Sequence, residues 1–367
     1  MNAIQNQLEA LHSQGNKVLG CFPLYPPLEL IHSMGIVPVI LWGFKPFFSQ
    51  VPLADRHVQN YACSVGRYLM EFVLQDKGKS LDGLLMYNAC DTLRNLPEII
   101  QKGLGEETVL PLHSFHIPAL SMDRSGAKEY LHDRLDELIA WLETTFSAKF
   151  SLESFQHSVN LYGQLRQLML KCQALAGEGK ALFSEYAALC ETLNFMPLEA
   201  QIPALEKFCA QKEANKPAPC NARVLMSGIL PPLREVLEIL ESAGLRIVAN
   251  DIASMHRAWA YTPAFADDPA AYYADLYENH FPCTTLLPTA DRRLAALESL
   301  LENSQARAWI FAGEKFCEHE YFELPYVEKA LKARGISTLN LEFSLGDEQN
   351  LGAMKTRIEA FAEIMND

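Results

Sequence analysis

The chain has 367 residues, 49% of them hydrophobic, and this length predicts two or three domains rather than one core. Its formal net charge of −14 argues against a nucleic-acid-binding protein, which needs clustered Lys and Arg to displace counterions from phosphates. The first residues lack the layout of a signal peptide, and no apolar run approaches the ~20 residues of a membrane helix, so we expect a cytoplasmic protein.

The first third of the chain alternates strand-like and helix-like segments, which is typical of a parallel sheet built from βαβ units. Residues 1–125 are therefore predicted to form an N-terminal α/β domain. In chain order we expect a strand at 17–22, a helix at 26–35, a strand at 37–43, a helix at 56–75, and strands at 81–90 and 115–122.

The middle of the chain is predicted to be a helical segment over residues 126–215, because its apolar residues recur with helical spacing. The stretch "EANKPAPCN" at 213–221 has two prolines and no periodicity, as expected of a linker. A C-terminal α/β domain is predicted over 216–367. It opens with strands "ARVLMSG" and "LRIVAND" and continues through "ARAWIFA" and "ISTLNLEF" to a final helix.

The two α/β parts resemble each other. "KVLG…PPLELIHSMGIVPVI" and "RVLMSG…PPLREVLEILESAGLRIVA" share a strand, Pro-Pro, a Leu- and Glu-containing helix, a glycine and a second strand. Each part later runs an apolar strand into a loop that contains a cysteine, "LDGLLMYNAC" and "ARAWIFAGEKFC". We infer an internal duplication in which Cys90 and Cys317 are structural counterparts.

The cysteines are the strongest candidates for a functional site. Ligands of open α/β sheets bind beyond the carboxyl ends of the strands, where Cys90 and Cys317 are expected to lie. Cys63, on the predicted helix at 56–75, could reach the same cleft, and three converging thiolates indicate metal binding. Cys90 also precedes a helix, whose N–H groups favour its thiolate. The alternative is that these cysteines are small buried apolar residues, which we expect of Cys172, Cys190 and Cys209.

Several motifs taken together resemble a known family. "YPPLELIHSMGIVPV", "YACSVGRYL", "NACDTLRNL", "RVLMSG" and "KFCEHEYFELP" occur in this order between Lys17 and Met365. The chain is similar to the 2-hydroxyacyl-CoA dehydratases, a family that includes subunits of ATP-dependent benzoyl-CoA reductase and the double-cubane cluster proteins.

The resemblance implies one [4Fe-4S] cluster per chain, held by Cys63, Cys90 and Cys317 in the cleft between two Rossmann-like parallel-sheet domains. One iron of such a cluster lacks a protein ligand. The enzymes of this family transfer one electron to an acyl-CoA thioester, which gives a ketyl radical anion. They work as heterodimers of paralogous subunits and receive electrons from a separate ATP-hydrolysing iron-sulfur activator. The absence of a P-loop from this chain agrees with that division of labour.

The chain departs from double-cubane relatives at Pro23 and Ala253, where those relatives carry cysteine. Cys21 and Cys283 remain as substitutes, but a double cluster needs roughly six thiolates, so we expect a single one. Two other roles stay open. The chain could be a non-catalytic electron-relay or structural subunit of a heterodimer, or a small-molecule reductase of the double-cubane type.

Glu29 is the candidate catalytic acid or base. It follows the first strand, so its carboxylate is expected at the same edge of the sheet as Cys90, where it could move the proton that dehydration requires. The alternative is that it favours the start of a helix after Pro26-Pro27.

Overall fold

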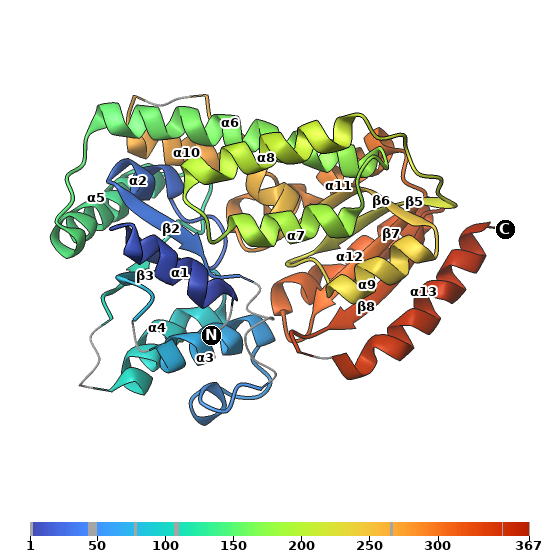
Figure 1. The fold of residues 1–367 in the computed structure, drawn as a ribbon, viewed down its shortest axis with the longest axis horizontal. Coiled ribbons are helices and arrows are strands. Elements are labelled where there is room, and N and C mark those ends of the chain that lie inside the picture. The colour runs from blue at the N-terminus through green and yellow to red at the C-terminus, as the bar shows by residue number, and fades with distance from the viewer. Residues whose placement is uncertain are drawn as a thin grey trace.

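The computed structural model describes residues 3–42, 50–76, 79–105, 110–264, 267–346 and 348–366. Within these ranges, eight strands form two parallel sheets of four strands each, with helices packed around them (Figure 1). The strand orders are β2-β1-β3-β4 and β6-β5-β7-β8. The predicted α/β fold with two parallel sheets is confirmed. In the part of the chain that the structure describes, no helix is long and apolar enough to cross a membrane.

The first sheet takes its strands from the N-terminal third of the chain. They are β1 (Lys17–Phe22), β2 (Ile36–Ile40), β3 (Gly83–Tyr87) and β4 (Leu112–Phe115). The accompanying helices are α1 (Ala3–Ser13), α2 (Leu28–Ser33), η1 (Ala54–Arg56), α3 (Ser64–Asp76) and α4 (Asp91–Leu104). Helices on both faces bury most of each central strand, which is why β1 and β3 read as nearly continuous apolar runs.

The second sheet repeats this plan in the C-terminal part. Its strands are β5 (Ala222–Gly228), β6 (Leu245–Ile252), β7 (Ala308–Glu314) and β8 (Ser337–Phe343). Around it lie α9 (Arg234–Ser242), η2 (Ala253–Arg257), α10 (Pro269–Asn279), η3 (Leu287–Arg292), α11 (Arg293–Ser304), α12 (Glu318–Ala333), η4 (Glu348–Asn350) and α13 (Leu351–Asn366).

The two sheets share one topology, as the internal repeat in the sequence predicts. The second strand of each order, β1 or β5, comes first in its part of the chain, and its neighbours follow in the same pattern. Gly35 and Gly244 are equivalent in the repeat. Each ends a helix with a positive φ, +72° and +76°, before the next strand begins, a backbone conformation that suits glycine.

Four helices connect the two sheets, in agreement with the helical middle segment. They are α5 (Ala127–Phe146), α6 (Leu152–Gly177), α7 (Phe183–Leu193) and α8 (Leu198–Glu213). At 1.5 Å per residue, the 26 residues of α6 span about 39 Å. This length lets α6 lie against α2 on one side and β6 on the other (Figure 1). The predicted linker at 213–221 has no regular element after Glu213, which ends α8. The domain boundaries at 125 and 215 stay predictions.

Two predicted elements are wrong in extent. The helix expected at 56–75 begins only at Ser64, because its first half, "RHVQNYAC", is poor in strong helix formers and folds into η1 and turns. The strand expected at 115–122 instead ends at Phe115, before Pro118. The first correction matters for function, since it moves Cys63 from inside a helix to its N-terminus.

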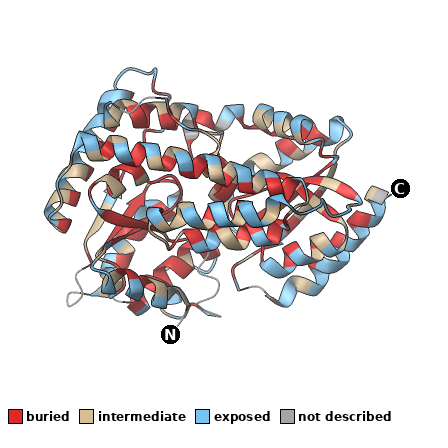
Figure 2. Ribbon diagram, turned by 45° about the horizontal axis from the view of Figure 1, so that its top comes forward, coloured by how far each residue is buried: buried red, intermediate tan, exposed pale blue. Residues whose placement is uncertain are grey.

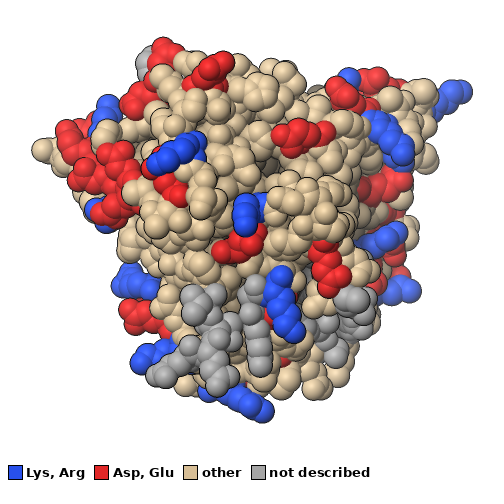
Figure 3. All heavy atoms as spheres, turned by 60° about the vertical axis from the view of Figure 1, so that its left-hand side comes forward, with Lys and Arg blue, Asp and Glu red and all other residues tan. Residues whose placement is uncertain are grey.

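The buried residues follow the sheets and the inner faces of the helices. Figure 2 shows buried residues along the strands, while the helices alternate between buried and exposed faces. Few charged side chains are buried. On the face in Figure 3, Lys and Arg are scattered among acidic and uncharged residues and form no continuous basic area.

The contact of α6 with β6 yields a test of the fold. A Cβ at Gly177 would meet the main-chain oxygen of Val248 at 2.5 Å, and main chain cannot move aside cheaply. We expect Gly177→Ala to lower the free energy of unfolding by about 1–3 kcal/mol, measured by urea denaturation. Gly163→Ala on the same helix is the control. It meets nothing within 4 Å and should raise stability by up to about 1 kcal/mol. Equal stability of the two variants would contradict this packing.

Candidate functional site

Three cysteines lie at the N-terminal ends of three helices. Cys90 is the N-cap of α4 and stands three residues after the end of β3. Cys317 is the N-cap of α12 and also stands three residues after the end of its strand, β7. Cys63 immediately precedes α3, and its carbonyl accepts a hydrogen bond from the amide of Arg67. The equivalence of Cys90 and Cys317 predicted from the sequence is therefore confirmed by the strand order and by the spacing.

A hydrogen-bond network holds the N-terminus of α3 against the second sheet. The carboxylate of Glu314, at the end of β7, accepts bonds from the amide of Ser64 at 2.9 Å and from its hydroxyl at 2.5 Å. The Ser64 hydroxyl in turn accepts a bond from the amide of Leu345 at 2.8 Å. Both Ser64 and Glu314 are buried. Cys63 is the neighbour of Ser64, so this network holds it close to the loop that carries Cys317.

The pKa values of the thiols show that they share one environment. Burial raises the pKa of Cys63 to about 12, with the Glu314 carboxylate and Cys90 adding to the effect. The pKa of Cys317 lies well above the ordinary value because of burial, then Glu320, Cys63 and Cys90. Burial also raises the pKa of Cys90, although two amides of α4 oppose it. The amides at the start of α4 favour the Cys90 thiolate as expected, but burial of the thiol outweighs them.

The three cysteines are intermediate in burial as whole residues. Within the described ranges, no three His, Cys, Asp or Glu side chains are arranged to hold a single metal ion. The structure thus brings the three cysteines together in one region without forming a mononuclear site. Two aromatic side chains next to them in the sequence, Tyr61 and Phe316, are 66% and 55% exposed.

Glu29 lies in a buried polar network away from the three cysteines. Its carboxylate pairs with the guanidinium of Arg166 on α6 and accepts bonds from the hydroxyls of Tyr272 and Tyr273 on α10, at 2.8 and 3.0 Å. Burial alone would lower the pKa of Arg166, but Glu29 raises it above its ordinary value. Among the described residues, none of the contacts of Glu29 is to Cys63, Cys90 or Cys317. The structure leaves its catalytic role a prediction.

A second buried network of charged side chains includes Glu320, three residues after Cys317 in α12. Arg257, at the end of the π-helix η2, contacts Glu320 at 2.8 Å and Asp251 at 3.6 Å. Arg293 pairs with the same Asp251 at 2.6 Å. These four side chains are at most 2% exposed. Such a group is stable only while every charge keeps its partner, and single π-turns of this kind recur at functional sites.

The comparisons with known proteins agree with this arrangement. The family model "2-hydroxyglutaryl-CoA dehydratase, D-component" matches residues 23–365, nearly the whole chain. The chain belongs to this family. The match includes every described strand except β1, the helical segment between the sheets, and Cys63, Cys90 and Cys317.

Three relatives match this chain over most of their own length. The beta subunit of (R)-phenyllactyl-CoA dehydratase from Clostridium sporogenes is 24% identical, over 98% of this chain and 94% of its own. The beta subunit of (R)-2-hydroxyglutaryl-CoA dehydratase from Acidaminococcus fermentans is also 24% identical, over 98% of this chain and 95% of its own length. One of the subunits of benzoyl-CoA reductase from Thauera aromatica is 25% identical, over 92% of this chain and 87% of its own length. The chain is therefore a member of a family of dehydratase and reductase subunits.

Of the six remaining cysteines of this dehydratase-family chain, Cys220 lies in the predicted linker and is partly buried. Cys172, Cys190 and Cys209 are buried in α6, α7 and α8, as predicted for apolar core residues. Cys21 is buried within β1, and burial raises its pKa strongly. Cys283 differs, because its sulfur accepts a hydrogen bond from Arg257 at 3.4 Å and lies 3.2 Å from the Thr285 hydroxyl. Of the two substitutes considered for a second cluster, only Cys283 has such polar neighbours.

Sequence reasoning missed the residues that support the cysteines. Glu314 gave a usable signal, since an acidic residue that ends a fully apolar strand must find a partner. Ser64 gave another, as the first residue of a helix. Arg257 and Asp251 gave none, because nothing in "NDIASMHRA" shows that both side chains fold into the interior beside α12.

The Glu29 network yields a prediction about stability. Glu29→Gln leaves the buried charge of Arg166 without its partner, so we expect the free energy of unfolding to fall by about 3–5 kcal/mol in chemical denaturation. Combining it with Arg166→Met should recover part of this loss. Glu199→Gln is the control, since the Glu199 side chain is 67% exposed and its pair with His32 is worth about 1 kcal/mol or less. A Glu29→Gln protein as stable as this control would show that the pair contributes little.

Proposed function

We propose that this chain is the iron-sulfur subunit of a radical CoA-thioester enzyme, of the 2-hydroxyacyl-CoA dehydratase or benzoyl-CoA reductase type. The observation that carries the proposal is the meeting of three half-buried cysteines, each at a helix N-terminus, at the carboxyl ends of β3 and β7. Family membership supports it, because the relatives act on CoA thioesters by their names.

The residues present fit a [4Fe-4S] cluster. Cysteine thiolates are its usual ligands, and Cys63, Cys90 and Cys317 supply three. Four irons and their sulfides separate the protein sulfurs more widely than one ion does, which agrees with the lack of a mononuclear site among the described residues. Burial, and after it the carboxylates of Glu314 and Glu320, raise the pKa values of the thiols. A cationic ligand is therefore favoured there and releases the thiol protons on binding.

When bound, such a cluster supplies single electrons of low potential to a CoA thioester. The surrounding residues stabilise and position the sulfur ligands. The amides of Thr92 and Leu93 point at the Cys90 sulfur and stabilise negative charge there. Glu314 fixes the start of α3, and thereby Cys63, relative to the second sheet. The chain carries no ATP-binding motif, so the electrons are proposed to come from a separate ATP-hydrolysing activator.

Glu29 remains our proposed proton-transfer residue. Its carboxylate lines a pocket in the cleft, so a bound acyl group could approach it. The ion pair with Arg166 holds the carboxylate in place, as a positioned proton-transfer group requires. Its bonds to Tyr272 and Tyr273 give it a second role, because they hold α10 against α2.

Ligation by the three cysteines can be tested directly. We expect Cys63→Ala, Cys90→Ala and Cys317→Ala each to remove most of the iron and visible absorbance of the anaerobically purified protein, because each deletes a ligand. Cys172→Ala is the control, since Cys172 is fully buried in α6. The unchanged protein should carry about four irons per chain. Full iron content in the Cys317 variant would contradict the assignment.

A partner subunit is the second expectation. Large aromatic side chains are exposed on and near α12 beside Cys317, namely Phe316, Phe322 and Tyr326, the last two 81% and 65% exposed. Exposed aromatic groups of this kind mark protein interfaces. We propose a heterodimer with a paralogous subunit that covers these exposed aromatic side chains.

Sedimentation of the co-expressed proteins tests the heterodimer. We expect Phe322→Asp to dissociate it, weakening affinity about tenfold or more because a charge would be buried at the interface. Ile364→Asp on α13 is the matched control, since Ile364 is also exposed, at 64%. A fully active monomer of the isolated chain would overturn the proposal.

A further inference from the structure

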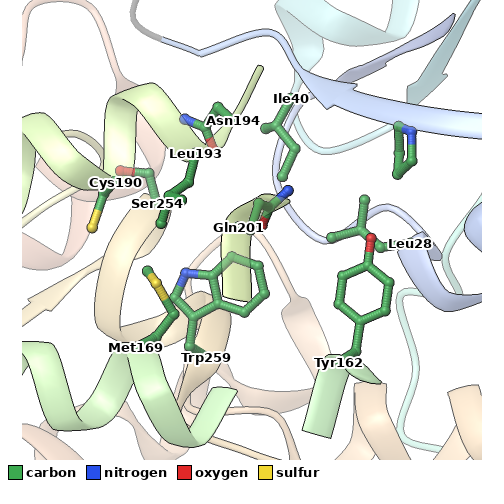
Figure 4. A pocket seen from close by; sticks show the side chains of 11 residues that line it. Leu28, Ile40, Tyr162, Met169, Cys190, Leu193, Asn194, Gln201, Ser254 and Trp259 are labelled. Carbon is green, nitrogen blue, oxygen red and sulfur yellow. The ribbon is translucent and has the colours of Figure 1, made fainter. Parts of the chain in front are cut away.

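An apolar pocket lies in the cleft beside Glu29. We call it the aromatic pocket and define it by its main apolar lining residues, Tyr25, Leu28, Ile40, Trp42, Trp259 and Leu276. Tyr25 and Trp42 follow β1 and β2, and Trp259 follows η2 beyond β6, so the pocket is built at the carboxyl ends of strands from both sheets. Its volume of about 50 Å³ is small. Figure 4 shows a neighbouring pocket, which shares Leu28, Ile40 and Trp259 with the aromatic pocket.

The aromatic pocket contains a buried hydrogen-bond acceptor without a partner. Nδ1 of His280 lies 2.6 Å from the carbonyl oxygen of Phe281, so it must carry the proton and donate it. Nε2 is then an acceptor, and among the described residues nothing donates to it. His280 is 3% exposed, and its ring contacts that of Tyr25, with centroids 4.1 Å apart and the ring planes inclined at 59°. Burial lowers the pKa of His280 to about 3, which keeps the acceptor unprotonated near neutral pH.

The backbone at Tyr25 supports a binding role for this pocket. Tyr25 has a φ of +46°, which is costly for a bulky side chain and is retained mainly where function requires it. Its buried hydroxyl also makes no hydrogen bond to a nitrogen or oxygen atom in the described part of the chain. The strained loop therefore places two polar atoms of adjacent rings, Tyr25 Oη and His280 Nε2, in a largely apolar setting.

The charges lining the pocket compensate one another. Glu29 and Arg166 both reach it, but they are paired with each other and with Tyr272. Among its described lining residues there is no further Lys or Arg to receive a carboxylate from a ligand. A ligand that carried a negative charge into the pocket would thus be buried without a counter-ion, which makes its binding unfavourable.

The pocket opens outward into a larger groove. This groove has a volume of about 330 Å³ and is lined by Pro231, Pro232 and Arg234 at the start of α9. Trp42, Asn194 and Ser254 line both spaces, so a ligand in the pocket can continue past them into the groove. Figure 4 shows Asn194 and Ser254 near Trp259 at this junction.

The pocket lies near the end of β3. Cys283 is close to both Tyr25, which lines the pocket, and Tyr87. Tyr87 ends β3, three residues before Cys90.

We propose that the aromatic pocket binds the acyl chain of an uncharged 2-hydroxyacyl-CoA, with His280 Nε2 accepting a hydrogen bond from the 2-hydroxyl group. The CoA arm then leaves through the groove at α9. This inference rests on the proposed function, which supplies the CoA thioester. It adds that the acyl chain is compact and apolar, and that a chain with a terminal carboxylate is rejected.

Equilibrium binding to the anaerobic holoprotein tests the proposal, with quenching of tryptophan fluorescence as the readout because Trp42 and Trp259 line the pocket. The probes are 2-hydroxy-4-methylpentanoyl-CoA, its analogue without the hydroxyl, and 2-hydroxyglutaryl-CoA. We expect the first to bind at least about tenfold more tightly than the third, because of the uncompensated charge. It should bind about fivefold more tightly than the second, because of one hydrogen bond.

A variant pair assigns the hydroxyl contact. In His280→Phe the preference for the hydroxylated probe should disappear. In His113→Phe, where the replaced ring stacks on Trp141 instead, the preference should remain. Equal binding of the neutral and dicarboxylic probes by the unchanged protein would overturn the proposal without any variant, as would a hydroxyl preference that survives in His280→Phe. Binding of no CoA ester at all, with iron retained in the cysteine variants, would instead overturn the proposed function.

Discussion

The bond between Glu314 and Ser64 determines where the cysteines meet. Each parallel sheet places one cysteine at its own edge, but neither sheet alone can bring in the third. The buried carboxylate at the end of β7 takes both the amide and the hydroxyl of Ser64 and so fixes the start of α3 against the second sheet. A buried carboxylate is tolerated only when its hydrogen bonds are made, so the contact is specific as well as stabilising.

A second polar contact joins the two sheets on the other side of the cleft. Glu29 belongs to the first part of the chain, Arg166 to the helical segment, and Tyr272 and Tyr273 to the C-terminal part. The cleft is thus bounded by two buried carboxylates, Glu314 beside the thiols and Glu29 beside the aromatic pocket. Both are held by donors from another segment of the chain, which fixes the width of the space between the sheets.

The sequence predicted what local periodicity and repetition determine. The strands "KVLGCF" and "ARVLMSG" have the predicted limits, and the repeat around Pro-Pro indicated the shared topology. The stretch at 56–75 was misread, since apolar periodicity cannot show where a helix starts when turns precede it. The residues that support the site could not be predicted from the sequence either. Asp251 and Glu320 meet Arg257 only because η2 and α12 pack together, and contacts between distant segments leave no local pattern in a single sequence.

The common spacing of the two cysteines in the repeat has a consequence for what the loops tolerate. Cys90 and Cys317 each stand three residues beyond a strand and directly before a helix, so strand and helix together fix the position of the sulfur. Side chains within these short connections can vary, as "YNAC" and "EKFC" show. Their length cannot. An insertion or deletion of a single residue would turn the helix start away from the cleft, so exchange of residue types is compatible with the site whereas a shift in loop length is not.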